Sequence, residues 1–164
     1  MTGRFARRFP ETAAELARLG PVHNHSDSHP NFTSVTVEAM RMELARAEES
    51  VSTVTGQSTL PFWRPPNGAR NRLALRTAAG EGYRSIYWTV DSKDAYQSGI
   101  GADAIVENVL RPRAGGRDPD HHLDGAIILM HVGIAETPRA LPRIIDGLRA
   151  RGFELVTVEE ILRP

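Results

Sequence analysis

The chain has 164 residues, 40% of them hydrophobic and 24% charged, which is typical of a soluble globular domain and excludes a disordered or fibrous protein. Its 20 basic and 20 acidic residues cancel, so neither nucleic acid nor an acidic membrane is expected as the main partner. The absence of cysteine excludes disulfides and thiolate metal ligands. Without a membrane-spanning apolar stretch or a signal-peptide pattern, we expect one soluble domain over residues 1–164 and leave its cellular location open.

The first part of the chain predicts two helices and a short strand. Residues 10–19 predict a helix that proline and glutamate open and that a Gly-Pro pair ends. Residues 21–25 are expected to be extended and to place His25 at a strand end. Residues 36–55 predict a second helix because their apolar side chains recur at helical spacing. Residues 60–63 predict a strand, which the prolines that follow cannot continue because proline lacks the N–H donor.

The middle of the chain continues this alternation. Residues 71–79 predict a helix that a glycine ends, and residues 83–90 predict a strand because they are rich in aromatic and β-branched side chains. Residues 102–110 predict another helix. Residues 111–124 are rich in Gly, Pro, Asp and His and are expected to form a polar loop.

The last part of the chain predicts the most deeply buried strand. Residues 126–130 are almost wholly apolar, which is typical of a strand covered on both faces in a parallel sheet. Residues 137–151 predict a helix, residues 153–158 a strand, and residues 159–162 a final turn. Strand and helix alternate about five times, which predicts a parallel α/β sheet or a barrel.

Two histidines, His25 and His29, follow the first extended segment at a spacing of four residues. Neutral imidazole nitrogens bind divalent metals, and a bound metal lowers the pKa of water enough to hydrolyse an amide or ester near neutral pH. Both rings would face one point if the chain turned helically between them. The alternative is two solvated histidines in a polar loop, because such a pair is common by chance.

Further candidates lie at the ends of the other predicted strands. His131 is a candidate general acid, or else a core histidine bound to the backbone. Asp91 or Asp94 is expected to accept a hydrogen bond from the His131 ring, or else to cap its own loop. Arg64 precedes two prolines and is a candidate for binding a catalytic carboxylate or the substrate bidentately, or else an ordinary surface arginine. Barrels gather catalytic groups at the carboxyl ends of their strands, which is where these residues are predicted to lie.

Two other groups of side chains are weaker candidates. The aromatic side chains that can stack on a sugar ring are Trp63, Tyr87, Trp88 and Tyr96, although aromatic residues in strands more often fill a core. The residues Asp118, Asp120, His121 and His122 are interpreted mainly as a solvated loop, with a metal site as the alternative.

Four fragments in this order resemble the motifs of the NodB-type polysaccharide deacetylases, carbohydrate esterase family 4: His25-Ser26-x-x-His29-Pro30, Arg64-x-Pro66-x-Gly68, Asp91-x-x-Asp94 and Leu129-x-His131. The resemblance runs from about Phe5 to the end of the chain. It implies a distorted (β/α) barrel that uses Zn²⁺, or another divalent metal such as Co²⁺, Ni²⁺ or Mn²⁺, to activate water. The implied reaction removes acetyl groups from N-acetylated glycans such as chitin or peptidoglycan.

The resemblance also implies a role for each matching residue. The implied metal ligands are His25 and His29. The implied catalytic residues are His131 as general acid, Arg64 as the group that orients the base, and Asp94 as the partner of the acid. The implied substrate-binding residues are Leu129, Pro66 and Tyr96, with Leu129 against the acetyl methyl group.

The sequence departs from the family pattern in two places. The family has tryptophan where this chain has Ala95, so one wall of the pocket is changed. The family also begins with a strand that carries an Asp-Asp pair, the base and the third metal ligand, whereas residues 1–5 here line up with the end of the family's second strand. The resemblance therefore implies an incomplete barrel of about five parallel strands with flanking helices. Asp27 is not expected to replace the missing carboxylates, because its side chain should point elsewhere.

Two classes of function follow from these observations. The first is a metal-dependent hydrolase that removes acetyl groups from N-acetylated polysaccharide, with activity impaired by the missing base. The second is a non-catalytic member that binds saccharide or a protein partner through the same cleft. A hydrolase of small amides or imides is a third interpretation, because no residue decides the substrate. The unpaired strand edges of an incomplete sheet also predict self-association.

Overall fold

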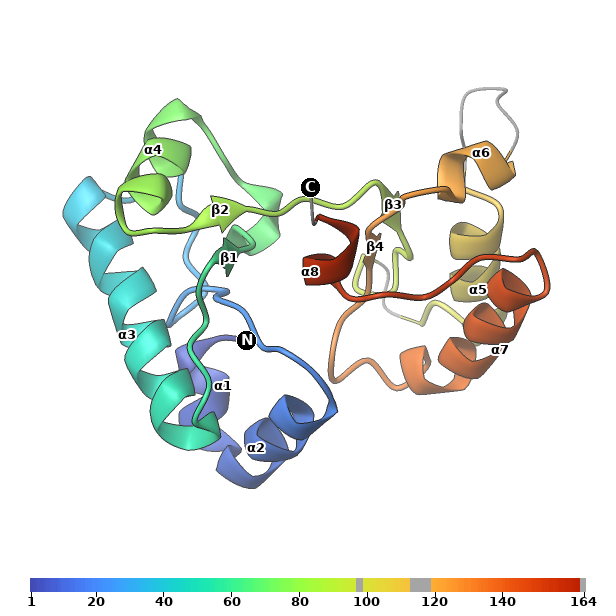
Figure 1. Cartoon of the computed structure of the whole chain (residues 1–164), viewed down its shortest axis with the longest axis horizontal. Helices are drawn as coiled ribbons and strands as arrows, with labels where there is room; N and C mark the ends of the chain where they lie inside the picture. The colour runs from blue at the N-terminus through green and yellow to red at the C-terminus, as the bar shows by residue number, and fades with distance from the viewer. Residues whose placement is uncertain (97–98, 113–118, 163–164) are drawn as a thin grey trace. The chain divides into compact units, whose positions relative to one another are not determined.

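The computed structural model describes residues 1–96, 99–112 and 119–162. The chain forms two compact units, Met1–Tyr87 and Trp88–Pro164, and each is described by itself. Within the described residues both units are mainly helical, and each contains one short pair of parallel strands (Figure 1). The chain is therefore an α/β protein with small parallel sheets, as the alternation of helix and strand predicts.

The first unit packs helices around one parallel strand pair. In chain order its elements are α1 (Gly3–Arg8), α2 (Pro10–Leu19), α3 (Val37–Thr55), β1 (Phe62–Trp63), the 3-10 turn η1 (Pro66–Gly68), α4 (Arg72–Gly80) and β2 (Arg84–Ser85). Phe62 lies opposite Arg84 in the parallel pair. Asn24 forms a further parallel bridge to Trp63, which fixes the residue just before His25 against β1.

Side-chain caps explain where the helices of this unit begin. Thr2, Thr36 and Asn71 each accept a hydrogen bond from the backbone N–H three residues further on, at the starts of α1, α3 and α4. Gly56 ends α3 in the left-handed region, at a φ of 72°. The predicted helices over 10–19, 36–55 and 71–79 are confirmed within one residue. The alignment of residues 1–5 with a strand end is wrong from Gly3 onward, because Thr2 caps a helix there.

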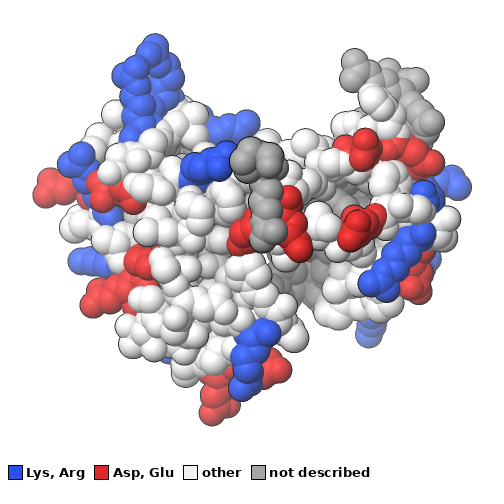
Figure 2. Space-filling view, in the orientation of Figure 1, with Lys and Arg blue, Asp and Glu red and all other residues white. Residues whose placement is uncertain are grey.

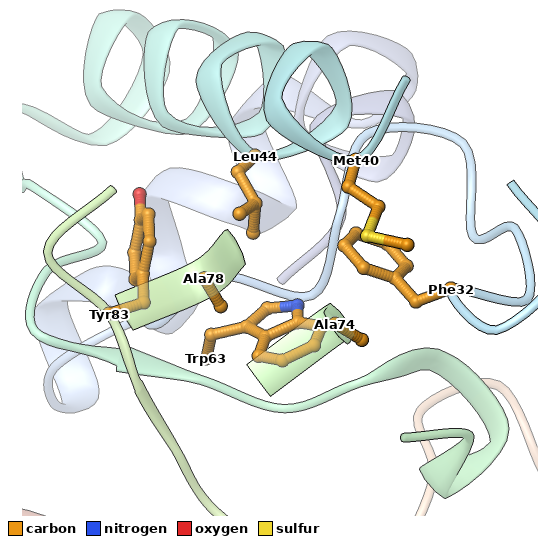
Figure 3. Close-up of a cluster of buried hydrophobic side chains, with 7 residues drawn as sticks. All are labelled: Phe32, Met40, Leu44, Trp63, Ala74, Ala78 and Tyr83. Atoms are coloured by element: carbon orange, nitrogen blue, oxygen red, sulfur yellow. The ribbon is translucent and has the colours of Figure 1, made fainter. Parts of the chain in front are cut away.

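The core of the first unit lies under α3. Its buried side chains are Phe32, Met40, Leu44, Trp63, Ala74, Ala78 and Tyr83. Figure 3 shows Met40 and Leu44 descending from α3 towards the Trp63 ring, with Phe32 beside Met40. Burial of each large apolar side chain contributes about 1.5–3 kcal/mol, so this cluster fixes α3 relative to β1.

The second unit is built on its own strand pair. Its elements are β3 (Val90–Asp91), α5 (Ala102–Leu110), α6 (Pro119–Leu123), β4 (Ile128–Leu129), α7 (Thr137–Arg149) and α8 (Val158–Ile161). Val90 lies opposite Ile128 in parallel register. Helices α5 and α7 bury Ile105, Val109, Ala140 and Ile144 in a cluster with Val90. This cluster places the ends of β3 and β4 side by side.

Several predicted elements differ in the structure. The predicted strand over 83–90 is divided between β2 and β3, which pair with different strands, because β1 ends before two prolines that cannot donate ladder bonds. Residues 153–157 are not a strand, and α8 follows them in place of a simple turn. Helix α6 replaces part of the loop predicted over 111–124, of which residues 113–118 lie outside the described residues.

The surface carries charges of both signs. Figure 2 shows basic and acidic side chains interspersed over the visible face. In the part of the chain that is described, none of the helices has the length and apolar character to cross a bilayer.

Candidate functional site

The two histidines of the first unit lie in a loop that joins the bridge at Asn24 to α3. The ring centroids of His25 and His29 are 4.8 Å apart, at an interplanar angle of 75°. The helical turn that the sequence analysis assumed between them is absent, because Ser26 and His29 have φ values of 66° and 69°. The two rings are close together all the same. Non-glycine residues in this left-handed region cost on the order of 1–3 kcal/mol each, so the surrounding contacts must hold the loop in place.

The tautomer of His25 follows from its partner. Nδ1 of His25 lies 2.7 Å from the carbonyl oxygen of Arg64. A carbonyl oxygen can only accept, so Nδ1 carries the proton and the lone pair of the neutral ring is on Nε2. A backbone carbonyl that orients the far side of a histidine in this way is the usual second layer of a metal site.

Electrostatics keep His25 neutral. Burial of the ring, followed by the nearby Arg64 guanidinium, lowers the pKa of His25 from 6.5 to about 3. The imidazole is therefore uncharged at neutral pH and its Nε2 is able to bind a metal. Burial also lowers the pKa of Arg64, although an arginine stays charged under physiological conditions.

The carboxylate between the histidines is turned away from them. Asp27 is buried, and both of its oxygens bind the Arg7 guanidinium, at 2.7 Å and 3.2 Å. Across the described ranges, 1–96, 99–112 and 119–162, no group of three or more His, Asp or Glu side chains is placed to hold a metal. In the described part of the first unit, His25 and His29 are therefore two candidate nitrogen ligands that no carboxylate joins to form a group of three, and Asp27 points towards Arg7.

The backbone of Arg64 contacts the histidine loop, and Pro66 lies two residues further along the chain. Arg64 donates its backbone N–H to the carbonyl of Asn24, and its own carbonyl receives the His25 ring. Its side chain is half-buried, and among the residues that the structure describes it has no hydrogen-bond or ion-pair partner. Pro66 is buried in η1 and helps to fix the backbone that follows. His25, His29 and the Arg64 backbone therefore lie together within this unit.

The second unit holds an aspartate–histidine pair. Oδ1 of Asp94 lies 2.7 Å from Nδ1 of His131, and Oδ2 accepts the backbone N–H of His131 at 2.8 Å. Thr137 donates its hydroxyl to Oδ2, also at 2.8 Å. Burial alone would raise the pKa of Asp94, but these bonds and a further one from Ser92 outweigh it and lower the pKa. The ionised carboxylate fixes Nδ1 of the half-exposed His131 as a donor, so the lone pair of the neutral ring is on Nε2.

The structure decides between the two aspartates that the sequence left open. Asp91 accepts the backbone N–H of Lys93 at 2.8 Å and pairs with its ammonium group at 3.2 Å, so it caps its own loop. Leu129 is buried in β4, two residues before His131. Tyr96 is 71% exposed two residues after Asp94, with the Lys93 nitrogen 4.7 Å from its ring centroid.

Sequence reasoning missed several residues that hold these groups. Glu43 and Asn24 bind the histidine loop, and Thr137 binds Asp94. Thr137 and Glu43 lie on helices far along the chain from the residues they contact, so no local pattern marks them. In the weaker cluster, Asp120 pairs with Arg151 at 3.0 Å, and Asp118 lies outside the described residues.

Comparisons with known proteins are consistent with this geometry. A family model described as polysaccharide deacetylase matches residues 1–86. A peptidoglycan-N-acetylglucosamine deacetylase of Bacillus cereus is 30% identical over 99% of this chain and 57% of its own length. A chitooligosaccharide deacetylase of Azorhizobium caulinodans is 26% identical over 93% of this chain and 75% of its own.

A solved structure also aligns with nearly the whole chain. It is a wild-type pseudoenzyme of carbohydrate esterase family 4 from Bacillus anthracis, 26% identical, with a TM-score of 0.85 over 99% of this chain and 53% of that one. A mutant of that pseudoenzyme with restored enzymatic activity aligns with the same TM-score over 55% of its chain. This chain spans little more than half the length of the first curated relatives that it matches, at 58% and 57%.

Proposed function

Because the chain belongs to the polysaccharide deacetylase family, we propose that it is a hydrolase that removes acetyl groups from an N-acetylated glycan of the chitin or peptidoglycan kind. Relatives named for peptidoglycan and chitooligosaccharide deacetylation support this substrate class. The observation that carries the proposal is the Asp94–His131 pair, in which a buried carboxylate orients a half-exposed imidazole.

In this proposal His131 protonates the leaving nitrogen. When water adds to the acetyl carbonyl and the C–N bond breaks, its electron pair goes to nitrogen, and the amine departs once it receives a proton. Nε2 of His131 would give that proton. Asp94 would stabilise the imidazolium and hold the ring in one orientation, with Thr137 holding Asp94 in turn.

We also propose that His25 and His29 bind a divalent metal, Zn²⁺ or else Co²⁺, Ni²⁺ or Mn²⁺. The neutral His25 ring with its fixed Nδ1–H fits a metal ligand. When bound, such an ion supplies an activated water. A catalytic zinc site usually needs three protein ligands, and the residues described supply two nitrogens without an adjacent carboxylate, so they do not complete the site by themselves.

The remaining predicted roles stay part of the proposal. The Arg64 guanidinium, to which none of the described side chains bonds, suits a carboxylate base, which it would bind bidentately. Tyr96 would stack on a sugar ring, Leu129 would contact the acetyl methyl group, and Pro66 would contact the substrate in the first unit. We also propose that the parallel strands belong to a distorted (β/α) barrel, and that the chain self-associates through unpaired strand edges.

A second candidate function is saccharide binding without catalysis. Two observations favour it: the Asp27 carboxylate is bound by Arg7 instead of facing the histidines, and the chain is similar to a family pseudoenzyme. In that case the same side chains would hold a glycan, but acetate would not be released.

Acetate release and calorimetry distinguish these functions. With N-acetylglucosamine oligomers and added Zn²⁺, the proposed hydrolase releases acetate, and His131→Ala lowers the rate by about 10²–10⁴-fold while oligomer binding persists. His121→Ala, at an exposed position in α6, is the matched control and should leave the rate unchanged. Binding without acetate release would support the second function. If the oligomers neither bind nor react, both proposals are refuted.

A further inference from the structure

The backbone N–H groups between the two histidines all donate to side chains, whereas the carbonyls of Ser26 and Asp27 accept the backbone N–H groups of Gly3 and Arg4 in α1. Four consecutive N–H groups each donate to a side-chain oxygen, and the distances are 2.9 Å from Ser26 to Asn24 Oδ1, 2.9 Å from Asp27 to Glu43 Oε2, 2.7 Å from Ser28 to Glu43 Oε2, and 3.0 Å from His29 to Ser26 Oγ. The Ser28 hydroxyl adds a bond of 2.6 Å to Glu43 Oε1. A loop whose donors are satisfied in this way has no helical or strand ladder to define its shape.

Of the side chains that accept these N–H groups, Glu43 is the one that lies outside the loop, and α1 adds contacts to the Ser26 and Asp27 carbonyls and to the Asp27 carboxylate. Its carboxylate receives three of these hydrogen bonds, and hydrogen bonds to an ionised acceptor are about twice as strong as neutral ones. Asn24 and Ser26, by contrast, belong to the loop itself. Glu43 is therefore the link between the histidine loop and α3.

The position of Glu43 is fixed by the core. Its neighbour Leu44 is 1% exposed and packs in the cluster of Figure 3, together with Met40 one turn earlier on α3. The half-buried Glu43 is thus carried on a rigid helix face. Ser26 and His29, in the left-handed region, would relax towards ordinary backbone conformations if this anchor were removed.

We propose that Glu43 is a positioning residue for the His25–His29 pair: its carboxylate holds the intervening loop in the conformation that brings the two rings together. The carboxylate is occupied by three donors of the loop, so its effect on any ligand of the histidines is indirect. An effect of Glu43 on metal affinity rests on the proposed function, whereas its effect on the geometry of the two rings does not.

Glu43→Ala and Glu43→Gln test this proposal. The first readout is the ring signals of His25 and His29 in NMR spectra of the metal-free protein, with His131 in the second unit as internal reference. In Glu43→Ala the His25 and His29 signals shift or broaden and the His131 signal stays. Glutamine keeps an oxygen that can accept the two N–H groups, so Glu43→Gln should restore most of the wild-type pattern.

Zn²⁺ affinity is the second readout. If the wild type binds Zn²⁺ through His25, Glu43→Ala raises the Kd by about 10–100-fold, the usual effect of removing a residue that orients metal ligands. Glu38→Ala, at an exposed position in the first turn of the same helix, should leave the Kd unchanged. Val51→Ala is a control for general destabilisation, because Val51 is buried in a separate cluster.

The outcomes separate this inference from the proposed function. If the wild type and His25→Ala bind Zn²⁺ with the same Kd, the metal proposal fails. The ring signals of His25 and His29 in the metal-free protein still decide the role of Glu43 in that case. If Glu43→Ala lowers the melting temperature as Val51→Ala does but leaves the His25 and His29 signals in place, Glu43 merely stabilises the fold and the inference is overturned.

Discussion

Acidification should destabilise the first unit through His25. In the folded chain burial and Arg64 lower the pKa of this ring from 6.5 to about 3, so it stays neutral where the unfolded chain already binds a proton. Between these values the unfolded state carries one more proton, and stability falls as the pH falls. The unfolding free energy should decrease by about 1.4 kcal/mol per pH unit, to a total of at most about 5 kcal/mol.

Urea unfolding monitored by fluorescence measures this slope. The chain has two tryptophans, so a Trp88→Phe background leaves buried Trp63 to report on the first unit. The range from about pH 4.5 to about pH 6.5 is the most informative. Hydrogen bonds lower the pKa of Glu48 from 4.5 despite its burial, so that carboxylate adds an acid dependence only below this range.

Comparison with His25→Gln isolates the contribution of the ring. The variant has no titrating group at this position, so its slope over the same range should be smaller than that of the parent by about 1.4 kcal/mol per pH unit. The slope that remains in both proteins comes from the Met1 amino group, because burial and then Arg64 lower its pKa from 8.0 to about 5. His121→Gln, which changes an exposed histidine in α6, should keep the full slope. If His25→Gln loses stability in parallel with its parent, His25 is not the titrating group and the reasoning about its burial is refuted.

Two substitutions probe the packing around the candidate residues. In Gly3→Ala the new Cβ overlaps the Asp27 carboxylate and crowds the backbone of α3. Thermal melts should therefore show a loss of about 1–3 kcal/mol in the free energy of unfolding. Gly80→Ala is the control and should cause no loss, because its Cβ meets nothing within 4 Å. A stable Gly3→Ala protein would contradict this packing. Thr137→Val removes the hydroxyl bond to buried Asp94 and should cost about 1–3 kcal/mol in urea unfolding of the second unit; an unchanged midpoint would show that water replaces the bond.

Local sequence signals were sufficient for most helices. The helices α2, α3, α4, α5 and α7 agree with the predictions because periodicity and caps act over three or four residues. The motif resemblance was also sufficient for the family, which the match over residues 1–86 confirms. The types of residue in the candidate site were therefore readable from the chain, with imidazoles, an arginine and an aspartate at predicted strand ends.

The strands and the site geometry depend on distant parts of the chain. Residues 153–157 have the composition of a strand but have no ladder partner in the described structure. A strand forms only where a neighbouring strand is available to pair with it, so composition alone did not predict this segment correctly. The selection of Asp94 over Asp91 depends on the position of β4 and on a hydroxyl from α7. The shape of the histidine loop depends on Glu43, which α3 holds in place.

Neighbouring residues and an ordered set of motifs were enough to predict most of the helices, the family and the chemistry available to the site. The tertiary structure decided which strands pair, which aspartate holds His131 and how the loop from His25 to His29 is bent. Those outcomes rest on hydrogen bonds between residues up to tens of positions apart, which form only when the core has brought their elements together.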